Sequence, residues 1–170
     1  MKNIVLIGMP ASGKSTAGVL LAKKIGYGFI DTDLLIQKRE GALLCDILKK
    51  HGAEGFIRIE ESVNAEVAAD RCVIATGGSV VYGERAMQNL KSIGTVVYLK
   101  VGIDSLKKRL NGEDIFARGV VMRKRGETLE ELLAERAPLY ERYADVTVDC
   151  DKLNLDQTVS AMISAVKHSI

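Results

Sequence analysis

Short apolar runs alternate along the chain with longer segments in which apolar residues recur at helical spacing. The apolar runs are rich in β-branched residues and are typical of buried strands. They lie at Ile4–Ile7, Phe29–Ile30, Val73–Ala75, Thr95–Leu99 and Val146–Val148. Because continuous apolar strands separated by helices favour a parallel sheet covered on both faces, we predict an α/β protein.

The helical pattern occupies the segments between these runs. It predicts helices at Lys14–Ile25, Leu34–Arg39, Leu43–Lys50, Ala53–Ala69, Glu84–Lys91, Ser105–Leu110, Leu129–Tyr143 and Leu155–Lys167. Gly26 is placed to end the first of these as its C′ residue. Thr128 with Glu131, and Asn154 with Gln157, have the spacing of capping boxes at the start of the last two.

One stretch between two predicted helices breaks this alternation. Residues 111–126 read NGEDIFARGVVMRKRG, a polar segment that contains glycine and ends in basic residues. We interpret it as a mobile lid over a binding site. An ordinary surface loop is the alternative that the sequence leaves open.

The composition is that of an ordinary globular protein, with 47% hydrophobic and 27% charged residues. Its 170 residues fit one domain, residues 1–170, with a substantial core. The formal net charge of +2 gives no whole-chain case for nucleic acid or an anionic membrane. No apolar run approaches the ~18–20 residues of a membrane span, and the N-terminal run is too short for a secretory signal. We expect neither nucleic acid nor membrane as a partner.

The cysteine content points to a reducing compartment. Cys45, Cys72 and Cys150 cannot all pair within one chain, and no C-x-x-C spacing exists. Reduced thiols in the cytoplasm are the simplest interpretation. We therefore expect a cytoplasmic protein, which we take to be a monomer.

A phosphate-binding loop follows the first predicted strand. Gly8-Met9-Pro10-Ala11-Ser12-Gly13-Lys14-Ser15 matches G-x-x-x-x-G-K-[ST] at every fixed position, between a strand and a helix as the motif requires. Its glycines let backbone N–H groups converge on phosphate oxygens, and the helix N-terminus adds the positive end of a dipole. A glycine turn that binds nothing is the alternative.

We assign nucleotide binding to seven residues of this loop: Gly8, Ala11, Ser12, Gly13, Lys14, Ser15 and Thr16. Lys14 is expected to reach the β- and γ-phosphates, and the Ser15 hydroxyl to bind Mg²⁺. The loop identifies a nucleotide site without identifying a reaction. A GTPase usually needs an N-K-x-D segment, which is absent, and a motor usually has an apolar strand that ends in Asp. Here the third strand ends instead in Thr76-Gly77-Gly78, a backbone surface that a small ligand can approach closely.

Together with further short segments in the same order, these motifs resemble the shikimate kinases, within the nucleoside-monophosphate-kinase-like P-loop enzymes. The resemblance runs from about Asn3 to Asp149. It rests on GMPASGKST, Asp31-Thr32-Asp33, GAEGFIRIEE at Gly52–Glu61, Ala75–Gly78, Val96–Leu99 and ERAPLYERYAD at Glu135–Asp145. It implies a three-layer α/β/α fold, with a five-stranded parallel sheet in the order 2-3-1-4-5, a mobile lid, and the use of ATP and Mg²⁺.

The D-T-D segment fits this resemblance on physical grounds. Residues two apart in extended chain face the same way, so Asp31 and Asp33 are expected to point together into the cleft at the end of a strand. The resemblance implies that Asp31 helps to hold Mg²⁺ through water. It implies that Asp33 accepts a hydrogen bond from the attacking hydroxyl and takes its proton. Turn or cap aspartates are the alternative.

Several arginines have implied roles. Arg136 would pair with a substrate carboxylate, which its planar fork suits, although an exposed helical i,i+4 pair is the alternative. Arg118, in the expected lid, would close on the transferring phosphate. Arg109 would stack on adenine, or would otherwise be a cation near a helix C-terminus.

Three departures from the family pattern surround the acceptor site. The family has Phe-Arg where this chain has Phe56-Ile57, and that arginine holds the substrate carboxylate. Arg58 follows, but one helical step turns a side chain by about 100°, so it replaces the missing arginine only if the helix shifts locally. The family's triple glycine is Gly77-Gly78-Ser79 here, and its lid segment R-P-L-L is Arg118–Val121. We assign acceptor binding to Asp33, Arg58, Gly77, Gly78 and Arg136.

The sequence therefore predicts an ATP-dependent kinase for a hydroxyl group on a small carboxylated metabolite, with Lys14, Asp33 and Arg118 in catalysis. Shikimate is the first candidate for the acceptor. A different small hydroxy acid, an amino-acid alcohol or a sugar acid is the second, because Ile57 cannot donate a hydrogen bond. From another class, a noncatalytic ATP-binding regulator is the third.

Overall fold

A computed structural model describes residues 2–110, 119–124 and 126–167. It contains a five-stranded parallel sheet in the order β2-β3-β1-β4-β5, which confirms the predicted topology. The strands are β1 (Asn3–Ile7), β2 (Gly28–Asp31), β3 (Cys72–Ala75), β4 (Gly94–Lys100) and β5 (Val146–Asp149). All of the predicted apolar runs therefore form strands, including the two-residue run Phe29–Ile30.

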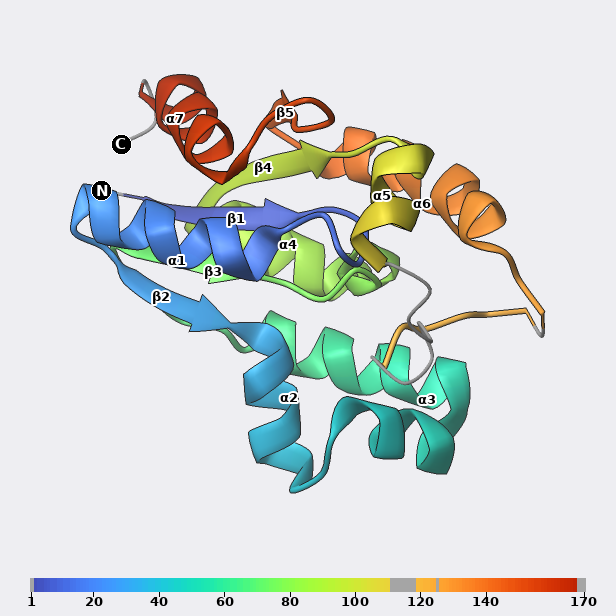
Figure 1. Ribbon diagram of the computed structural model, residues 1–170. Helices are drawn as coiled ribbons and strands as arrows, with labels where there is room; N and C mark the ends of the chain where they lie inside the picture. Colours follow the sequence, from blue (N-terminus) through green and yellow to red (C-terminus); the bar gives the residue numbers. More distant parts are fainter. Residues whose placement is uncertain (1, 111–118, 125, 168–170) are drawn as a thin grey trace.

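Helices cover both faces of the sheet (Figure 1). They are α1 (Lys14–Ile25), α2 (Thr32–Glu40), α3 (Leu44–Ala65), α4 (Glu84–Ile93), α5 (Ile103–Leu110), α6 (Leu129–Tyr143) and α7 (Leu155–Val166), with the short 3₁₀ turn η1 (Val80–Tyr82). One face is covered by α1 and α7, and the other by α4 and α6. The three-layer α/β/α prediction is thus confirmed.

The predicted helix boundaries need corrections in the α2–α3 region. The two helices expected at Leu43–Lys50 and Ala53–Ala69 are both present within α3, separated by the non-helical residue Gly52, but the second ends at Ala65 instead of Ala69. Gly52 has φ 68° and ψ 178°, a conformation that glycine adopts without a Cβ penalty, so the chain bends there and the helix resumes. The second part ends at Ala65 because the following N–H, of Glu66, turns back to the Val63 carbonyl.

The predicted caps are present. Gly26 is left-handed, with φ 70°, and its N–H bonds the Ala22 carbonyl. Thr128 with Glu131 forms a capping box at α6, and Asn154 with Gln157 forms another at α7. These local signals could be identified from the sequence because both partners of each cap lie within four residues of one another.

Strand β1 lies at the centre of the core. Its residues Ile4–Ile7 are at most 1% exposed. At its first residue, the Asn3 amide group donates to the Ala69 and Ile93 carbonyls at 2.7 and 2.9 Å and accepts from the Cys72 N–H at 2.9 Å. This one buried side chain therefore connects the central strand to the segments that lead into β3 and β4.

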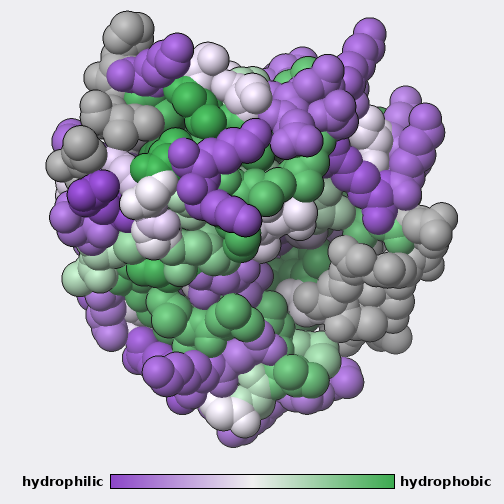
Figure 2. Space-filling view, turned by 60° about the vertical axis from the view of Figure 1, so that its left-hand side comes forward, coloured by the Kyte–Doolittle hydropathy of each residue, from purple (hydrophilic) through white to green (hydrophobic). Residues whose placement is uncertain are grey.

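The surface mixes hydrophilic and apolar side chains (Figure 2). Among the large apolar residues, Leu34 and Leu43 are the most exposed, at 62% and 61%. Within the described ranges, the helices are all too short or too polar to span a bilayer. Of the expected lid, residues 111–118 and 125 lie outside the described residues, so its mobility stays a prediction.

Candidate active site

A cavity of about 290 Å³ opens at the carboxyl ends of the strands, where ligands bind in open α/β sheets. Its walls come from the phosphate loop, from α2, α3 and α6, from the chain after β3, and from residues 119–121. Most of the residues assigned from the sequence line it: Ala11, Gly13, Lys14, Ser15, Thr16, Asp33, Gly77, Gly78 and Arg136. Segments far apart in the sequence therefore meet at one site.

The phosphate loop presents its backbone to this cavity. Gly13, with φ 95°, is the N-cap residue of α1, and no side chain caps that helix. The first-turn N–H groups therefore have no side-chain partner and can bind an anion. Ala11 also has positive φ, at 62°, so the loop carries backbone strain at the place where the motif predicts phosphate contacts.

Lys14 lies folded over its own loop. Its ammonium group donates to the Gly8 and Met9 carbonyls, at 2.8 Å each, and to the Ser12 hydroxyl at 3.4 Å. Burial lowers the pKa of Lys14 to about 8, against the opposing effect of the Asp33 carboxylate. An added phosphate would favour the charged form, because opposite charges stabilise each other in a poorly hydrated site.

Asp31 joins the end of β2 to the phosphate loop. Its Oδ2 accepts a hydrogen bond from the Ser15 hydroxyl at 2.7 Å, and its Oδ1 accepts from the Asp33 N–H at 3.0 Å. Asp31 is thus the N-cap residue of α2, as one of the alternatives held. The argument from extended chain was wrong, because Asp33 lies in the first turn of α2 rather than in the strand.

The two aspartates nevertheless come together beside the phosphate loop. Asp33 lines the cavity, and its carboxyl group has a pKa raised to about 6, mainly by burial and then by the charge of Asp31. Lys14 opposes this increase. A carboxyl group that titrates near 6 is mostly ionised at neutral pH and can accept a proton from a hydroxyl group in the cavity.

The oxygens of Ser15 and Asp31 suit Mg²⁺. This ion prefers oxygen ligands and is usually held by one or two carboxylates, phosphate groups and water. The adjacent hydroxyl and carboxylate, next to a phosphate loop, match that preference. Within the described part of the chain, no cluster of three or more His, Cys, Asp or Glu side chains forms a separate metal site.

Gly77 and Gly78 form the floor of the cavity after β3. A methyl group on Gly77 would collide with Glu60 Oε1 and lie 2.8 Å from Asp33 Oδ1. One on Gly78 would lie 2.8 Å from Pro10 and 3.0 Å from Arg136 Nη1. Both positions therefore require glycine for close packing.

Arg136 is fully buried, which excludes the alternative of an exposed helical ion pair. Its Nη2 donates to the Val121 carbonyl at 2.6 Å, and its Nε donates to the Tyr82 hydroxyl at 3.2 Å. Its guanidinium carbon lies 5.2 Å from the centre of the Tyr82 ring. Nη1 has no hydrogen bond to a described residue and lies beside Gly78 at the cavity floor. The guanidinium is thus oriented by protein contacts while one nitrogen faces the cavity.

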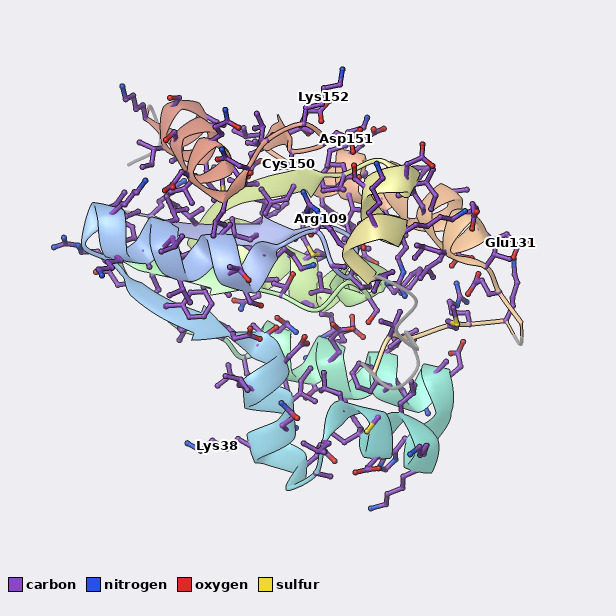
Figure 3. All side chains as sticks on the ribbon, viewed as in Figure 1. Lys38, Arg109, Glu131, Cys150, Asp151 and Lys152 are labelled. Carbon is purple, nitrogen blue, oxygen red and sulfur yellow. The ribbon has the colours of Figure 1, made fainter. Side chains whose placement is uncertain are left out.

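Arg109 lies outside the cavity, on the other side of the phosphate loop. Its Nη1 donates to the Ser12 carbonyl at 2.9 Å and its Nη2 to the Cys150 carbonyl at 3.3 Å. Figure 3 shows Arg109 between the start of α1 and the loop that carries Cys150 and Asp151. It therefore connects the phosphate loop to the chain after β5, and stacking on adenine stays a prediction.

Of the residues assigned to acceptor binding, Arg58 is not brought into the cavity. Arg58 is exposed on α3, with its Nη2 3.9 Å from the position of a methyl group on Gly55. Ile57 packs partly buried against the apolar cluster of α2 and α3. Lys14 and Arg136 are the only basic side chains among the described residues that line the cavity. Arg118 lies outside the described residues, so its role stays a prediction.

Three residues of the site were missed. Glu60 lines the cavity from α3, Tyr82 contacts Arg136, and the Tyr140 hydroxyl donates to the Gly78 carbonyl at 2.6 Å. A signal existed for Glu60: it lies four residues after Phe56, on the apolar face of a predicted helix. A carboxyl group in such a position is unusual in a core.

The phosphate loop, the two aspartates and the buried arginine around one cavity define a small-molecule kinase of the P-loop class. The shikimate kinase family model matches residues 10–167. A shikimate kinase of Clostridium botulinum (strain 657 / Type Ba4) is 38% identical over 98% of this chain and 97% of its own. One of Thermodesulfovibrio yellowstonii is 36% identical over 96% and 94%. The chain belongs to the shikimate kinase family.

The solved structures agree with this membership. The shikimate kinase of Acinetobacter baumannii in complex with shikimate superposes with a TM-score of 0.88 and 28% identity, over 99% of this chain and 94% of its own. The predicted family and enzyme class are therefore confirmed, and the chain is an enzyme that transfers phosphate to a hydroxyl group.

Proposed function

We propose that the protein transfers the γ-phosphoryl group of ATP to a hydroxyl group of shikimate, giving shikimate 3-phosphate and ADP. The proposal is carried by the single cavity in which Lys14, Asp33 and Arg136 meet. These side chains suit a phosphate, a reacting hydroxyl and a carboxylate, in that order. The relatives bear the name of this activity, and one related structure contains shikimate.

In the proposed reaction, the acceptor hydroxyl donates a hydrogen bond to Asp33. Its oxygen forms a bond to the γ-phosphorus while the bond from that phosphorus to the β,γ-bridging oxygen breaks. The proton passes to the Asp33 carboxylate, whose pKa of about 6 suits that transfer. Lys14 offsets negative charge on the phosphates, and Arg136 Nη1 binds the acceptor carboxylate. Positioning is the main contribution in this chemistry.

Ser15 and Asp31 are the residues we propose to hold Mg²⁺, which neutralises phosphate charge when bound. The free thiols of all three cysteines support a cytoplasmic location. We further propose a monomeric enzyme of one domain, residues 1–170, with its lid at residues 111–126, that acts on a small molecule and not on nucleic acid or a membrane.

One observation favours a second acceptor. Ile57 offers no hydrogen bond where the family pattern has arginine, and Arg58 is exposed outside the cavity. A different small hydroxy acid, an amino-acid alcohol or a sugar acid therefore remains the second candidate. The noncatalytic regulator is disfavoured, because Lys14, Ser15, Asp31 and Asp33 are all present around the phosphate loop.

The test is coupled ADP release with a panel of hydroxylated acids, hydroxy amino acids and sugars. We expect turnover with shikimate that Lys14→Met lowers by at least about 100-fold, the scale of losing one preorganised charge at a transition state. Lys23→Met is the matched control, because Lys23 is exposed in the last turn of the same helix. If only another acceptor is turned over, that acceptor takes the place of shikimate in the proposed function. ATP binding without any turnover would support the noncatalytic regulator.

A further inference from the structure

Glu60 is a buried carboxyl group with one unused oxygen. It is 1% exposed, and its Oε2 accepts a hydrogen bond from the Ser79 hydroxyl at 2.5 Å. Its Oε1 is buried as well and has no hydrogen-bond partner among the described residues. Buried polar atoms without partners are uncommon in folded proteins because they lose their hydrogen bonds to water. The Oε1 atom therefore points to a missing partner.

The geometry shows where that partner would lie. Glu60 and Asp33 both line the cavity, and a methyl group on Gly77 would meet Glu60 Oε1 and Asp33 Oδ1 together. The two carboxyl oxygens therefore converge over Gly77, on the acceptor side of the phosphate loop. A ligand whose hydroxyl reaches Asp33 would bring its neighbouring atoms to Glu60.

Among the described residues, no cationic side chain is hydrogen-bonded to Glu60 Oε1. Ile57, one helical turn before Glu60 on α3, packs against apolar side chains. Ser79, where the family pattern has a third glycine, contributes a hydroxyl to Oε2 only. Two of the departures from the family pattern thus surround the same carboxyl group, and together they leave Oε1 to the ligand.

The charge of Glu60 supports the same interpretation. Burial raises its pKa to about 8, and the Asp33 charge adds to the shift, while Ser79, Arg136 and Lys14 oppose it. At neutral pH the group is mostly protonated, so it does not repel a carboxylate bound at Arg136. With this proton on Oε2, that oxygen donates to the Ser79 hydroxyl instead of accepting from it, and Oε1 is left as a carbonyl-like acceptor.

We propose that Glu60, held by Ser79, is a specificity-determining residue whose Oε1 accepts a hydrogen bond from a second O–H or N–H group of the acceptor, while Arg136 binds its carboxylate. This inference rests on the proposed function, since it names the chemistry that the same site selects. A hydroxy acid with a further hydroxyl group and a hydroxy amino acid both offer this combination. An acceptor with one hydroxyl group and a carboxylate alone does not.

The test compares shikimate, its analogues that each lack one hydroxyl group other than the phosphorylated one, and L-homoserine as a hydroxy amino acid. The readout is kcat/KM at saturating ATP for wild type, Glu60→Gln, Glu60→Leu and Ser79→Gly. Glu61→Gln is the matched control, because Glu61 is the next residue and accepts from the Arg85 N–H instead of facing the cavity. Thermal melting confirms that each variant is folded.

Wild type should lose about 10-fold in kcat/KM on one of the deoxy analogues, the scale of one hydrogen bond. Glu60→Gln, which keeps a carbonyl oxygen, and Glu61→Gln should show the same loss. Glu60→Leu should have similar kcat/KM values for shikimate and for that analogue. Ser79→Gly should have a smaller difference in kcat/KM between the two than wild type, because Ser79 no longer holds Glu60. If Glu60→Leu does not fold, Ser79→Gly decides.

Equal losses on every analogue in wild type, Glu60→Leu and Ser79→Gly would overturn the inference while leaving shikimate as the acceptor. Turnover of L-homoserine in place of shikimate, abolished in Glu60→Leu and kept in Glu60→Gln, would keep the inference and overturn shikimate. If no probe is turned over or bound by the folded wild type, the proposed function fails, and the inference fails with it.

Discussion

The Tyr82 hydroxyl accepts a hydrogen bond from Arg136 Nε at 3.2 Å and donates one to Glu135 at 2.6 Å. Two guanidinium carbons, those of Arg136 and Arg123, also lie 5.2 and 5.3 Å from the centre of the Tyr82 ring. Tyr82 thus orients the arginine to which we assign the acceptor carboxylate, although Tyr82 itself does not line the cavity.

Tyr82→Phe should therefore raise KM for the acceptor by about 3- to 10-fold and leave KM for ATP unchanged. The substitution removes one hydrogen bond and keeps the stacked ring, and a net bond of this kind contributes about 0.5–1.5 kcal/mol. Steady-state kinetics with each substrate varied in turn measures both constants. Tyr143→Phe is the control, since Tyr143 is the last residue of α6 and makes no hydrogen bond to Arg136. An equal rise in both KM values would contradict a positioning role.

Asp33→Asn should lower turnover by at least about 100-fold while ATP binding persists, because Asp33 is assigned to the acceptor side. In wild type, kcat/KM should rise as the pH increases through about 6, since the carboxylate form accepts the proton and the pKa of Asp33 is raised to that value. This limb should be absent in the residual activity of Asp33→Asn. Calorimetric titration with ATP measures whether nucleotide binding persists. A loss of ATP affinity in Asp33→Asn without a rate defect would contradict the assignment of Asp33 to the acceptor side of the cavity.

Ile57→Arg should increase kcat/KM for shikimate by about 10- to 150-fold, the worth of charge-assisted hydrogen bonds of about 1.5–3 kcal/mol. The new guanidinium would start one helical turn before Glu60, at the position where the family pattern has the arginine that holds the substrate carboxylate. An uncharged polyol should gain nothing. Arg58→Ala is the matched variant and should change neither rate, because Arg58 is exposed outside the cavity. Efficient shikimate turnover by wild type, unchanged in Ile57→Arg, would show that one arginine suffices.

Glu60 should also make the folded state less stable as the pH rises from about 4.5 to about 8. Its pKa is raised to about 8 in the folded protein, so in this interval the folded chain holds a proton that the unfolded chain has released. Raising the pH then favours the unfolded chain.

The glutamine side chain in Glu60→Gln cannot ionise, so this variant should lack the pH dependence. The melting temperature of Glu60→Gln minus that of wild type should therefore increase from pH 5 to pH 8. Calorimetric melting of both proteins, with Glu61→Gln alongside, measures the difference and cancels the contributions of Asp33 and Lys14. Parallel melting curves across this interval would mean that Glu60 is ionised in the folded state.

The sequence predicted the elements whose causes are local. Each strand is an apolar run, Gly26 needs only its own left-handed conformation, and the capping boxes join residues three apart. The resemblance supplied the strand order, which no local pattern contains. The break at Gly52 was predicted correctly, because a glycine between two helical patterns is a local signal, whereas the end of the second helix at Ala65 was placed four residues too late.

The site residues that were predicted are likewise those with a local signal in the sequence. The phosphate loop is contiguous, so its residues could be assigned from a motif. Asp33 was assigned correctly to the neighbourhood of Asp31, but for the wrong reason, since the helix begins one residue before it. Tyr82 and Glu60 depend on contacts between segments, Tyr82 with α6 and Glu60 with Ser79, that neither residue's own surroundings in the sequence indicate.

Asn3 holds three segments of chain together at the end of the sheet opposite the cavity. Its side chain contacts no residue of the active site, so its contribution concerns how many molecules are folded and not how fast each one works. In a cell, where unfolded chains are removed continuously, the stability that this amide group contributes would raise the abundance of the enzyme. The amount of working enzyme therefore depends in part on a residue that takes no part in the reaction.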